Sequence, residues 1–184
     1  MRLSTQTLVQ LPAGVRRPRY DRTAVKPGIV HLGVGAFHRA HQAVVLDDLL
    51  AALAERGFEE LGAAVARAAD AADPRERLLR IAQAYVACAR AHPERFRLMF
   101  GPLLAGQDTN SPLRAAARRA FGHVAAAAAA HDTAHGADLA LAGWSLAHGL
   151  SHLLIDGAFD GLPIKRSNPE ALARRLAERL FGER

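Results

Sequence analysis

The sequence predicts an all-α helical bundle over most of its length, and three observations carry this prediction. Half of the 184 residues are hydrophobic but only 5% are aromatic, and much of the apolar content is alanine, the strongest helix former. Valine and isoleucine, which favour strands, become sparse after Asp47. From that residue onward, apolar side chains recur at helical spacing between helix start and stop signals.

The first 46 residues differ from the rest. Prolines and glycines interrupt a polar stretch there, and the apolar run Gly28–Leu32 indicates one candidate strand. The segment Ala36–Leu50, which follows the glycines, is a candidate helix. A lone strand leaves its backbone groups unpaired, so we do not expect residues 1–46 to form an independent domain. The sequence therefore predicts a short irregular N-terminal segment followed by one helical domain over residues 47–184.

Six helices are expected in the second region. Three of them begin with a side-chain N-cap followed directly by proline at the first helical position, which is a strong start signal. These starts are Asp73-Pro74, Ser111-Pro112 and Asn168-Pro169. The expected helices are Asp47–Ala69, Pro74–His92, Glu94–Phe100, Pro112–Ala130, Leu139–Ile155 with Asp138 as its cap, and Glu170–Phe181. The first of them has an apolar stripe near helical spacing, formed by Leu49, Leu50, Leu53, Phe58, Leu61 and Val65.

The fifth of these helices is apolar around most of its circumference. Its large apolar residues are Leu139, Leu141, Trp144, Leu146, Leu150, Leu153, Leu154 and Ile155. A helix of this kind is buried on all sides, which in a small bundle requires either many neighbours or a second copy of the chain. With the leucine row of the last helix, it predicts a homodimer whose four-helix interface uses residues 139–155 and 170–181.

Composition limits the other functional classes. The net charge is +6 and the pI about 10.6, but the arginines alternate with acidic residues along the helices, which indicates a solvated surface more than a nucleic-acid interface. Cys88 is the single cysteine, typical of a buried apolar position in a reducing cytoplasm. We found no apolar stretch long enough to cross a membrane and no signal peptide, so we expect a cytoplasmic protein without a membrane partner.

The region from Asp47 onward resembles a TetR-family regulatory domain. Trp144-Ser-Leu-Ala-His148-Gly149 matches the Trp-x-x-x-His-Gly signature of the subfamily often called the WHG domain. The stretch His92–Phe100 resembles the short central helix of that subfamily, and Leu49–Leu61 resembles the helix that links its DNA-binding and regulatory domains. The order and spacing of these motifs make the resemblance specific.

This resemblance implies a homodimer with a largely apolar effector pocket in each bundle, where a bound small apolar effector shifts the linking helix. The residues expected to form the pocket are Tyr85, Cys88, Phe96, Met99, Phe100, Phe121, Trp144 and His148. Such pockets combine apolar walls with a few polar groups, here Tyr85, Trp144 and His148. Because we saw no charged anchor, we expect a hydrophobic or cationic effector.

The TetR family also places a helix-turn-helix of about 45 residues before the linking helix. The motifs that typically end it do not occur before Leu49. We therefore expect no direct DNA binding by this chain.

His148 and His152 lie four residues apart on one helix face. This spacing suits a metal, but the glutamate of a His-Glu-x-x-His site and a third ligand are both missing. We expect hydrogen-bonding histidines and no metal site.

The N-terminal segment resembles a different family. Leu11–Gly14, Pro18–Asp21 and above all Gly28–Gln42 are similar to the start of mannitol dehydrogenases and fructuronate reductases. That family uses this segment as the first strand and glycine turn of a dinucleotide-binding domain. Here no βαβ pattern follows, and the only lysines, Lys26 and Lys165, lack the context of the catalytic lysine. We therefore expect Gly33 and Gly35 to be vestigial, with no bound cofactor.

Three hypotheses follow. The first is an effector-binding and dimerisation domain of a TetR-family regulator without its helix-turn-helix, and therefore not an enzyme. The second is a truncated, inactive NAD-dependent polyol dehydrogenase. The third is a dimerisation partner that binds no ligand and captures full-length regulators.

Overall fold

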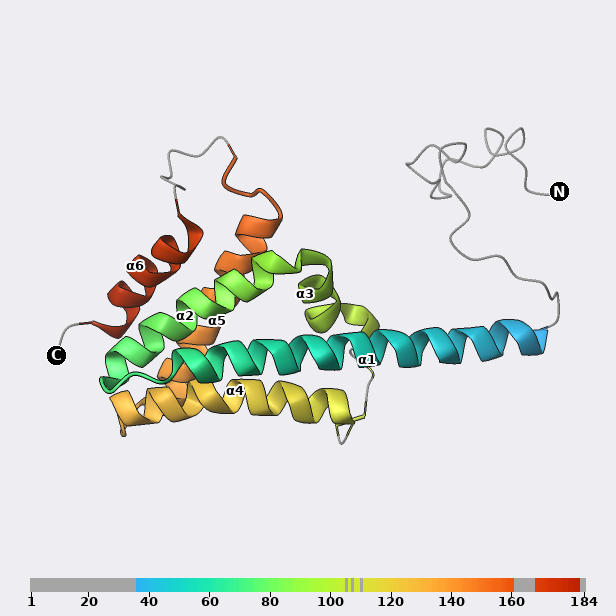
Figure 1. The fold of residues 1–184 in the computed structure, drawn as a ribbon, viewed down its shortest axis with the longest axis horizontal. Helices are drawn as coiled ribbons and strands as arrows, with labels where there is room; N and C mark the ends of the chain where they lie inside the picture. Colours follow the sequence, from blue (N-terminus) through green and yellow to red (C-terminus); the bar gives the residue numbers. More distant parts are fainter. Residues whose placement is uncertain (1–35, 105, 107, 110, 161–167, 183–184) are drawn as a thin grey trace. The chain divides into compact units, whose positions relative to one another are not determined.

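The structure is a computed structural model that describes residues 36–104, 106, 108–109, 111–160 and 168–182. The chain divides into two compact units, Met1–His41 and Gln42–Arg184. The described residues form six α-helices, a 3-10 helix and no strand, so the predicted all-α class is confirmed (Figure 1). The candidate strand Gly28–Leu32 and the glycine turn at Gly33 and Gly35 lie outside the described residues.

The helices follow one another with short connections. They are α1 (Ala36–Ala68), α2 (Pro74–Ala91), α3 (Pro93–Phe100), the 3-10 helix η2 (Pro102–Leu104), α4 (Pro112–His131), α5 (Gly136–Ile155) and α6 (Pro169–Phe181). No helix among the described residues is long and apolar enough to cross a membrane.

The three predicted N-caps are confirmed. The Asp73 carboxylate accepts from the backbone N–H groups of Arg75 and Glu76 at the start of α2. The Ser111 hydroxyl accepts from the Arg114 N–H at 3.3 Å, and the Asn168 side chain accepts from the Ala171 N–H at 2.8 Å. In all three helices proline follows the cap, where its missing N–H costs nothing.

Two predicted boundaries were wrong. Helix α1 begins at Ala36 and not at Asp47, because the residues before Asp47 continue the helical backbone without a break. Helix α5 begins at Gly136, so that Asp138 lies in its first turn. The preceding turn is held by Asp132, whose carboxylate accepts from the N–H groups of Ala134 and His135.

The turn between α4 and α5 requires a glycine for steric reasons. A Cβ on Gly136 would lie 2.7 Å from the Cα of Ala129 and 3.0 Å from its nitrogen. These are backbone atoms, which cannot move aside as a flexible side chain can. Gly136 therefore sets how closely the start of α5 approaches the end of α4.

The second unit is organised around α2, which packs against α3, α4, α5 and α6. Figure 1 shows this arrangement, in which α2 and α5 lie among the other helices. Helix α1 approaches its neighbours at glycines. A Cβ on Gly57 would lie 2.5 Å from the Met99 sulfur, and one on Gly62 would lie 3.5 Å from the Cα of Ala120.

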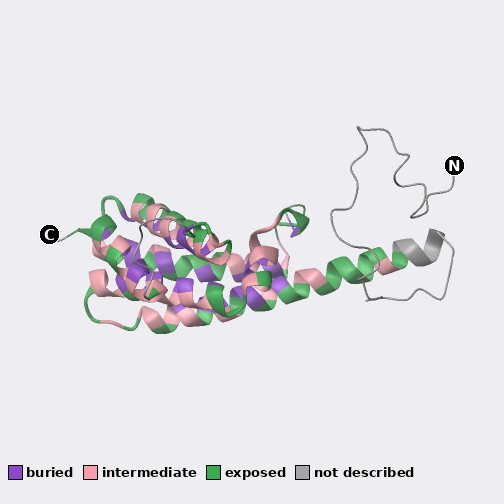
Figure 2. Cartoon of the chain, turned by 90° about the horizontal axis from the view of Figure 1, so that it is seen from above, coloured by how far each residue is buried: buried purple, intermediate pink, exposed green. Residues whose placement is uncertain are grey.

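The two halves of α1 are buried to different degrees (Figure 2). From Ala54 onward the helix contributes Phe58, Leu61 and Val65 to the core. Before Ala54, Leu50 is partly buried, but the other large apolar side chains described are exposed, including Leu49 at 62%. The apolar stripe predicted from the sequence is therefore covered over only half of its length.

Helix α5 is not buried all round within one chain. Leu150 is 4% exposed, but Leu141 is 55% and Leu153 is 44% exposed. The exposed positions Leu141, Ser145, Gly149 and Leu153 follow a spacing of four and share one face.

Ion pairs connect the helices at the surface. Glu76 on α2 accepts from Arg174 on α6 at 2.8 and 3.0 Å, and from Arg80 one turn along α2. The bonds from Arg174, followed by those from Arg80, lower the pKa of Glu76 from 4.5 to about 2. Glu60 on α1 pairs in the same way with Arg95 on α3.

Candidate functional site

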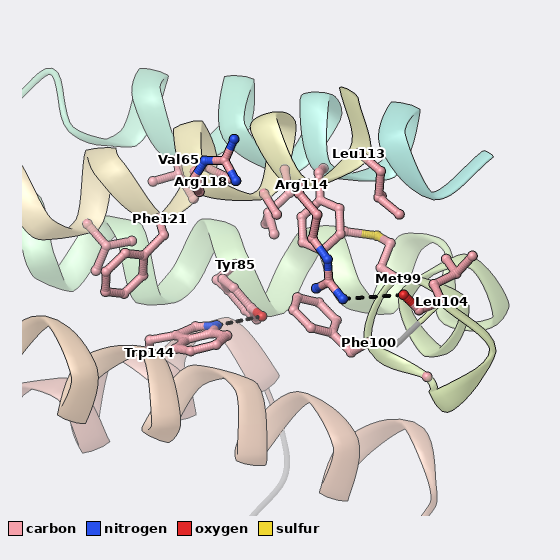
Figure 3. Close-up of a pocket in the computed structure, with 16 residues that line it drawn as sticks. Val65, Tyr85, Met99, Phe100, Leu104, Leu113, Arg114, Arg118, Phe121 and Trp144 are labelled. Atoms are coloured by element: carbon pink, nitrogen blue, oxygen red, sulfur yellow. Dashed lines mark hydrogen bonds between the residues drawn. The ribbon is translucent and has the colours of Figure 1, made fainter. Parts of the chain in front are cut away.

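A pocket of about 570 Å³ opens into the second unit between α1, α2, α3, α4 and α5. This volume lies within the usual range for small-molecule sites. Figure 3 shows the lining residues as sticks, with the aromatic rings below α4 and the arginines extending from it. The described lining residues are Phe58, Leu61, Val65, Tyr85, Met99, Phe100, Gly101, Leu104, Leu113, Arg114, Ala117, Arg118, Ala120, Phe121, Val124 and Trp144.

The pocket is open because small and large side chains face each other across it. Helix α4 presents Ala117 and Ala120, which leave space that a leucine would fill. Around them, aromatic rings meet edge to face and hold one another in place: Phe58 and Phe100 at 5.1 Å, and Phe121, which is on α4 as well, and Trp144 at 5.6 Å. Rigid rings cannot collapse into the gap as flexible side chains would.

The polar groups at the floor of the pocket form a hydrogen-bonded chain. The Trp144 indole N–H donates to the Tyr85 hydroxyl at 3.3 Å (Figure 3), and that hydroxyl lies 2.9 Å from Nδ1 of His148. Because an indole can only donate, the Tyr85 oxygen accepts from Trp144 and its own proton points to His148. His148 then accepts at Nδ1, which places the proton of the neutral ring on Nε2.

Burial keeps both titratable members of this chain neutral. It raises the pKa of Tyr85 well above its usual value, so the hydroxyl stays protonated. Burial, and then the neighbouring His152, lowers the pKa of His148 below 6.5. The chain therefore offers hydrogen bonds without charge, which suits recognition of a ligand better than acid–base catalysis.

His148 is surrounded by rings. Its centroid lies 4.4 Å from that of Phe100, 5.3 Å from that of Phe96 and 4.7 Å from that of His152. The two histidines do come together on α5 as predicted. Among the described residues, however, no three His, Cys, Asp or Glu side chains are grouped as a metal would need.

The structure brings most of the predicted pocket residues together. Tyr85, Met99, Phe100, Phe121 and Trp144 line the pocket. His148 is connected to it through the Tyr85 hydroxyl. Phe96 packs edge to face on Tyr85 at 5.9 Å, behind the wall.

Cys88 lies apart from the pocket. It borders a separate void of about 10 Å³ with Phe96 and Met99, and burial raises the pKa of its thiol. A protonated, half-buried thiol is a weak nucleophile, which agrees with a packing role.

Two groups of lining residues were missed in the sequence. The sequence predicts only a packing stripe for Phe58, Leu61 and Val65, whereas these residues form the α1 wall of the pocket. Arg114 and Arg118 were not considered, although they precede Phe121 by seven and three residues and so share its helix face. That spacing was the sequence signal that could have placed both arginines at the pocket. The expectation of a pocket without a charged residue is thus corrected.

Comparison with known proteins identifies the helical region. The family model described as "Tetracyclin repressor-like, C-terminal domain" matches residues 78–180, more than half of the chain. The chain belongs to this family. The structure is also similar to that of a protein of unknown function from Rhodococcus sp. RHA1, with a TM-score of 0.62 and 27% identity over 72% of this chain and 70% of the other. The TetR-type resemblance is therefore confirmed.

The resemblance to dehydrogenases is also confirmed, but over short segments. The chain is 63% identical over 51 residues to mannitol 2-dehydrogenase of Cereibacter sphaeroides, covering 28% of this chain and 11% of that protein. It is 50% identical over 48 residues to polyol:NADP oxidoreductase of Gluconobacter oxydans, covering 26% of this chain and 10% of that protein. The chain thus spans about a tenth of the length of these relatives.

Proposed function

We propose that residues 47–184 form the effector-binding and dimerisation domain of a TetR-type regulator, and that the effector occupies the pocket between α1 and α5. The observation that carries this proposal is the pocket itself, which has a volume of about 570 Å³ and a mostly apolar wall. The hydrogen-bonded chain from Trp144 to His148 supplies the few polar groups that orient a small molecule. Of the eight residues predicted from the sequence, Tyr85, Met99, Phe100, Phe121 and Trp144 line this pocket, His148 and Phe96 contact Tyr85 behind it, and Cys88 lies apart.

Binding can be measured with a neutral apolar probe. Trp144 is the only tryptophan of the chain and lines the pocket, so its emission reports on occupancy. We expect N-phenyl-naphthylamine to change the Trp144 emission with saturation and to raise the melting temperature. A ligand that binds only the folded protein stabilises it by about 2.7 kcal/mol at a hundredfold excess over Kd.

A pocket-filling variant tests where the probe binds. Ala117→Leu places extra methyl groups inside the pocket and should abolish the response. Ala126→Leu makes the same change at an exposed position of the same helix and should leave it unchanged. Equal binding by both variants, or no binding by the unaltered protein, would contradict the proposed function and favour a dimerisation partner without a ligand.

Dimerisation through α5 and α6 is part of the same proposal. The exposed face of α5 has leucines at both ends, Leu141 and Leu153, and the small residues Ser145 and Gly149 between them, and a Cβ on Gly149 would meet nothing within 4 Å. Leu180 on α6 is also exposed, at 36%. A second copy laid on this face would remove Leu141, Leu153 and Leu180 from water and form a four-helix interface.

Light scattering after size exclusion, over a range of dilutions of the full chain, tests the dimer. We expect the mass of two chains, and a shift to the mass of one chain in Leu153→Glu. The matched control is Leu103→Glu, since Leu103 is 75% exposed on η2. A dimer that tolerates Leu153→Glu but not Leu103→Glu would place the interface elsewhere.

We propose a binding protein and not an enzyme, located in the cytoplasm. The family match covers the helical region, whereas the dehydrogenase matches cover 28% of the chain or less in the two relatives described above. NADH fluorescence should not increase on addition of the protein, and a gel shift with promoter DNA should show no sequence-dependent complex. Saturable NADH binding would instead favour the truncated dehydrogenase.

A further inference from the structure

The pocket is asymmetric in charge. Arg114 and Arg118, one turn apart on α4, both line it. Figure 3 shows Arg114 extending from α4 into the pocket, with its guanidinium between the rings of Tyr85 and Phe100 and the loop at Leu104. Arg118 is exposed and lies at the rim. The remaining lining residues among those described include no aspartate or glutamate.

Backbone carbonyls fix the positions of both arginines. Arg114 donates from Nη2 to the Leu104 carbonyl at 3.3 Å, and Arg118 donates from Nη1 to the Thr109 carbonyl at 2.6 Å. A carbonyl oxygen carries no net charge, so these two hydrogen bonds do not cancel the positive charge of either guanidinium. Arg118 has no carboxylate within ion-pair distance among the described residues, whereas its neighbour Arg119 lies 3.9 Å from Glu59.

The opposite part of the pocket is apolar. Phe121, Val124 and Trp144 form its wall, and the one polar atom of Trp144, its indole N–H, is already bonded to Tyr85. A molecule placed along α4 from Arg114 to Phe121 would therefore meet positive charge at one end and ring faces at the other.

We propose that the effector is an amphiphilic monocarboxylate, with its carboxylate bound by Arg114 and its apolar body against Phe121 and Trp144. This inference rests on the proposed function and names the ligand class of that site. Arginine matches a carboxylate with two parallel N–H donors, and the apolar wall strengthens the attraction because it lowers the local dielectric. Arg118 adds attraction at the rim, where water and salt weaken it.

A pair of probes that differ in one group tests the charge requirement. Decanoate and decanol have the same chain, and each would compete with N-phenyl-naphthylamine for the pocket of the full-length protein. We expect decanoate to displace the probe at a concentration roughly ten- to a hundredfold lower than decanol, as the loss of a charge-assisted hydrogen bond implies. Added salt should reduce this preference.

Variants on α4 assign the preference to a residue. Arg114→Gln should abolish the preference for decanoate while probe binding persists. Arg118→Gln should reduce the preference only a few-fold, since Arg118 is exposed. The matched control is Arg119→Gln, which removes the same charge from the same helix at a position that does not line the pocket, and it should keep the preference.

The folding of Arg114→Gln needs its own control, because Arg114 holds the Leu104 carbonyl. Arg114→Lys keeps the charge and should retain a preference for decanoate, so the assignment can be tested even if Arg114→Gln does not fold.

The outcomes separate this inference from the proposed function. If the probe binds but decanoate competes no better than decanol, the carboxylate assignment is overturned and the apolar pocket stands. A preference that survives in Arg114→Gln, or disappears equally in Arg119→Gln, also overturns it. If the probe itself does not bind, the proposed function fails first.

Discussion

The core has two parts that differ in how completely they are filled. The pocket cluster gathers around Tyr85 and Trp144 and surrounds the cavity, whereas the packed cluster consists of Val86, Leu150, Phe159, Leu172 and Ala173. Tyr85 and Val86 are neighbours on α2, yet each belongs to a different cluster. None of the packed cluster lines the pocket. The cavity is therefore a local feature built by particular residues and not a general looseness of an alanine-rich bundle.

The same truncation in both clusters gives the largest expected difference. Leu150 and Leu113 are each 4% exposed, but Leu150 is in the packed cluster and Leu113 lines the pocket. We expect Leu150→Ala to lower the free energy of unfolding by about 3 kcal/mol, in the range for a buried leucine. Leu113→Ala should cost less, because part of its side chain already faces empty space and has no partner to lose. Urea unfolding of both variants measures this, and equal losses would refute the contrast.

Enlarging a side chain should have opposite effects in the two clusters. Ala173 is 1% exposed among close neighbours, so Ala173→Leu should destabilise the protein by about 1–3 kcal/mol through overpacking. Ala117→Leu, which extends into the pocket, should be neutral or stabilising, by up to about 1 kcal/mol. Thermal melts of the two variants without ligand decide the matter. A destabilised Ala117→Leu would mean that the cavity is smaller in solution.

A weaker effect is expected from pH. Because burial lowers the pKa of His148 in the folded protein, the unfolded chain takes up a proton more readily at this residue. Its contribution to stability is thus present above pH 6.5 and is lost as the pH falls below it. We expect the melting temperature to drop over that window, and to drop less in His148→Gln. The control is His123→Gln, at an exposed position of α4, which should keep the full pH dependence.

The smallest effect concerns the surface pair that joins α2 to α6. Glu76 has a lowered pKa, so its pairing with Arg174 stabilises the fold above pH 4.5 and is lost as the pH falls toward about 2. The side chains are 26% and 34% exposed, so solvent screens the pair. Glu76→Gln should cost about 0.5–1 kcal/mol at neutral pH. The 85% exposed Glu94 provides a control, since Glu94→Gln should change stability less.

The helix caps could be predicted from sequence because local chemistry decides them. Asp73, Ser111 and Asn168 each begin a helix as expected, since an N-cap needs only its own helix. Tyr85 and Trp144 were predicted from the resemblance to the TetR family instead, because their contact depends on how α2 packs against α5.

Arg114 and the exposed half of α1 could not be predicted in that way. An arginine in a helix is usually solvated, and only the approach of α3 and η2 turns this one into a pocket residue. Leu49 and Leu61 belong to the same apolar stripe of α1, yet Leu49 is 62% exposed and Leu61 is 4% exposed. Periodicity shows that a helix has an apolar face, but it does not show where a neighbouring helix ends.

Helix α1 also has a mechanical consequence. Phe58, Leu61 and Val65 touch the pocket, and the same unbroken helix continues back to Leu46 without a proline or a kinking glycine pair. With a rise of about 1.5 Å per residue, Leu46 lies roughly 18 Å along the axis from Phe58, so a tilt of about 5° at the pocket displaces it by roughly 1.6 Å. The helix is thus a lever whose short arm rests on the pocket, and its stiffness sets how far a small displacement at the pocket moves the other end.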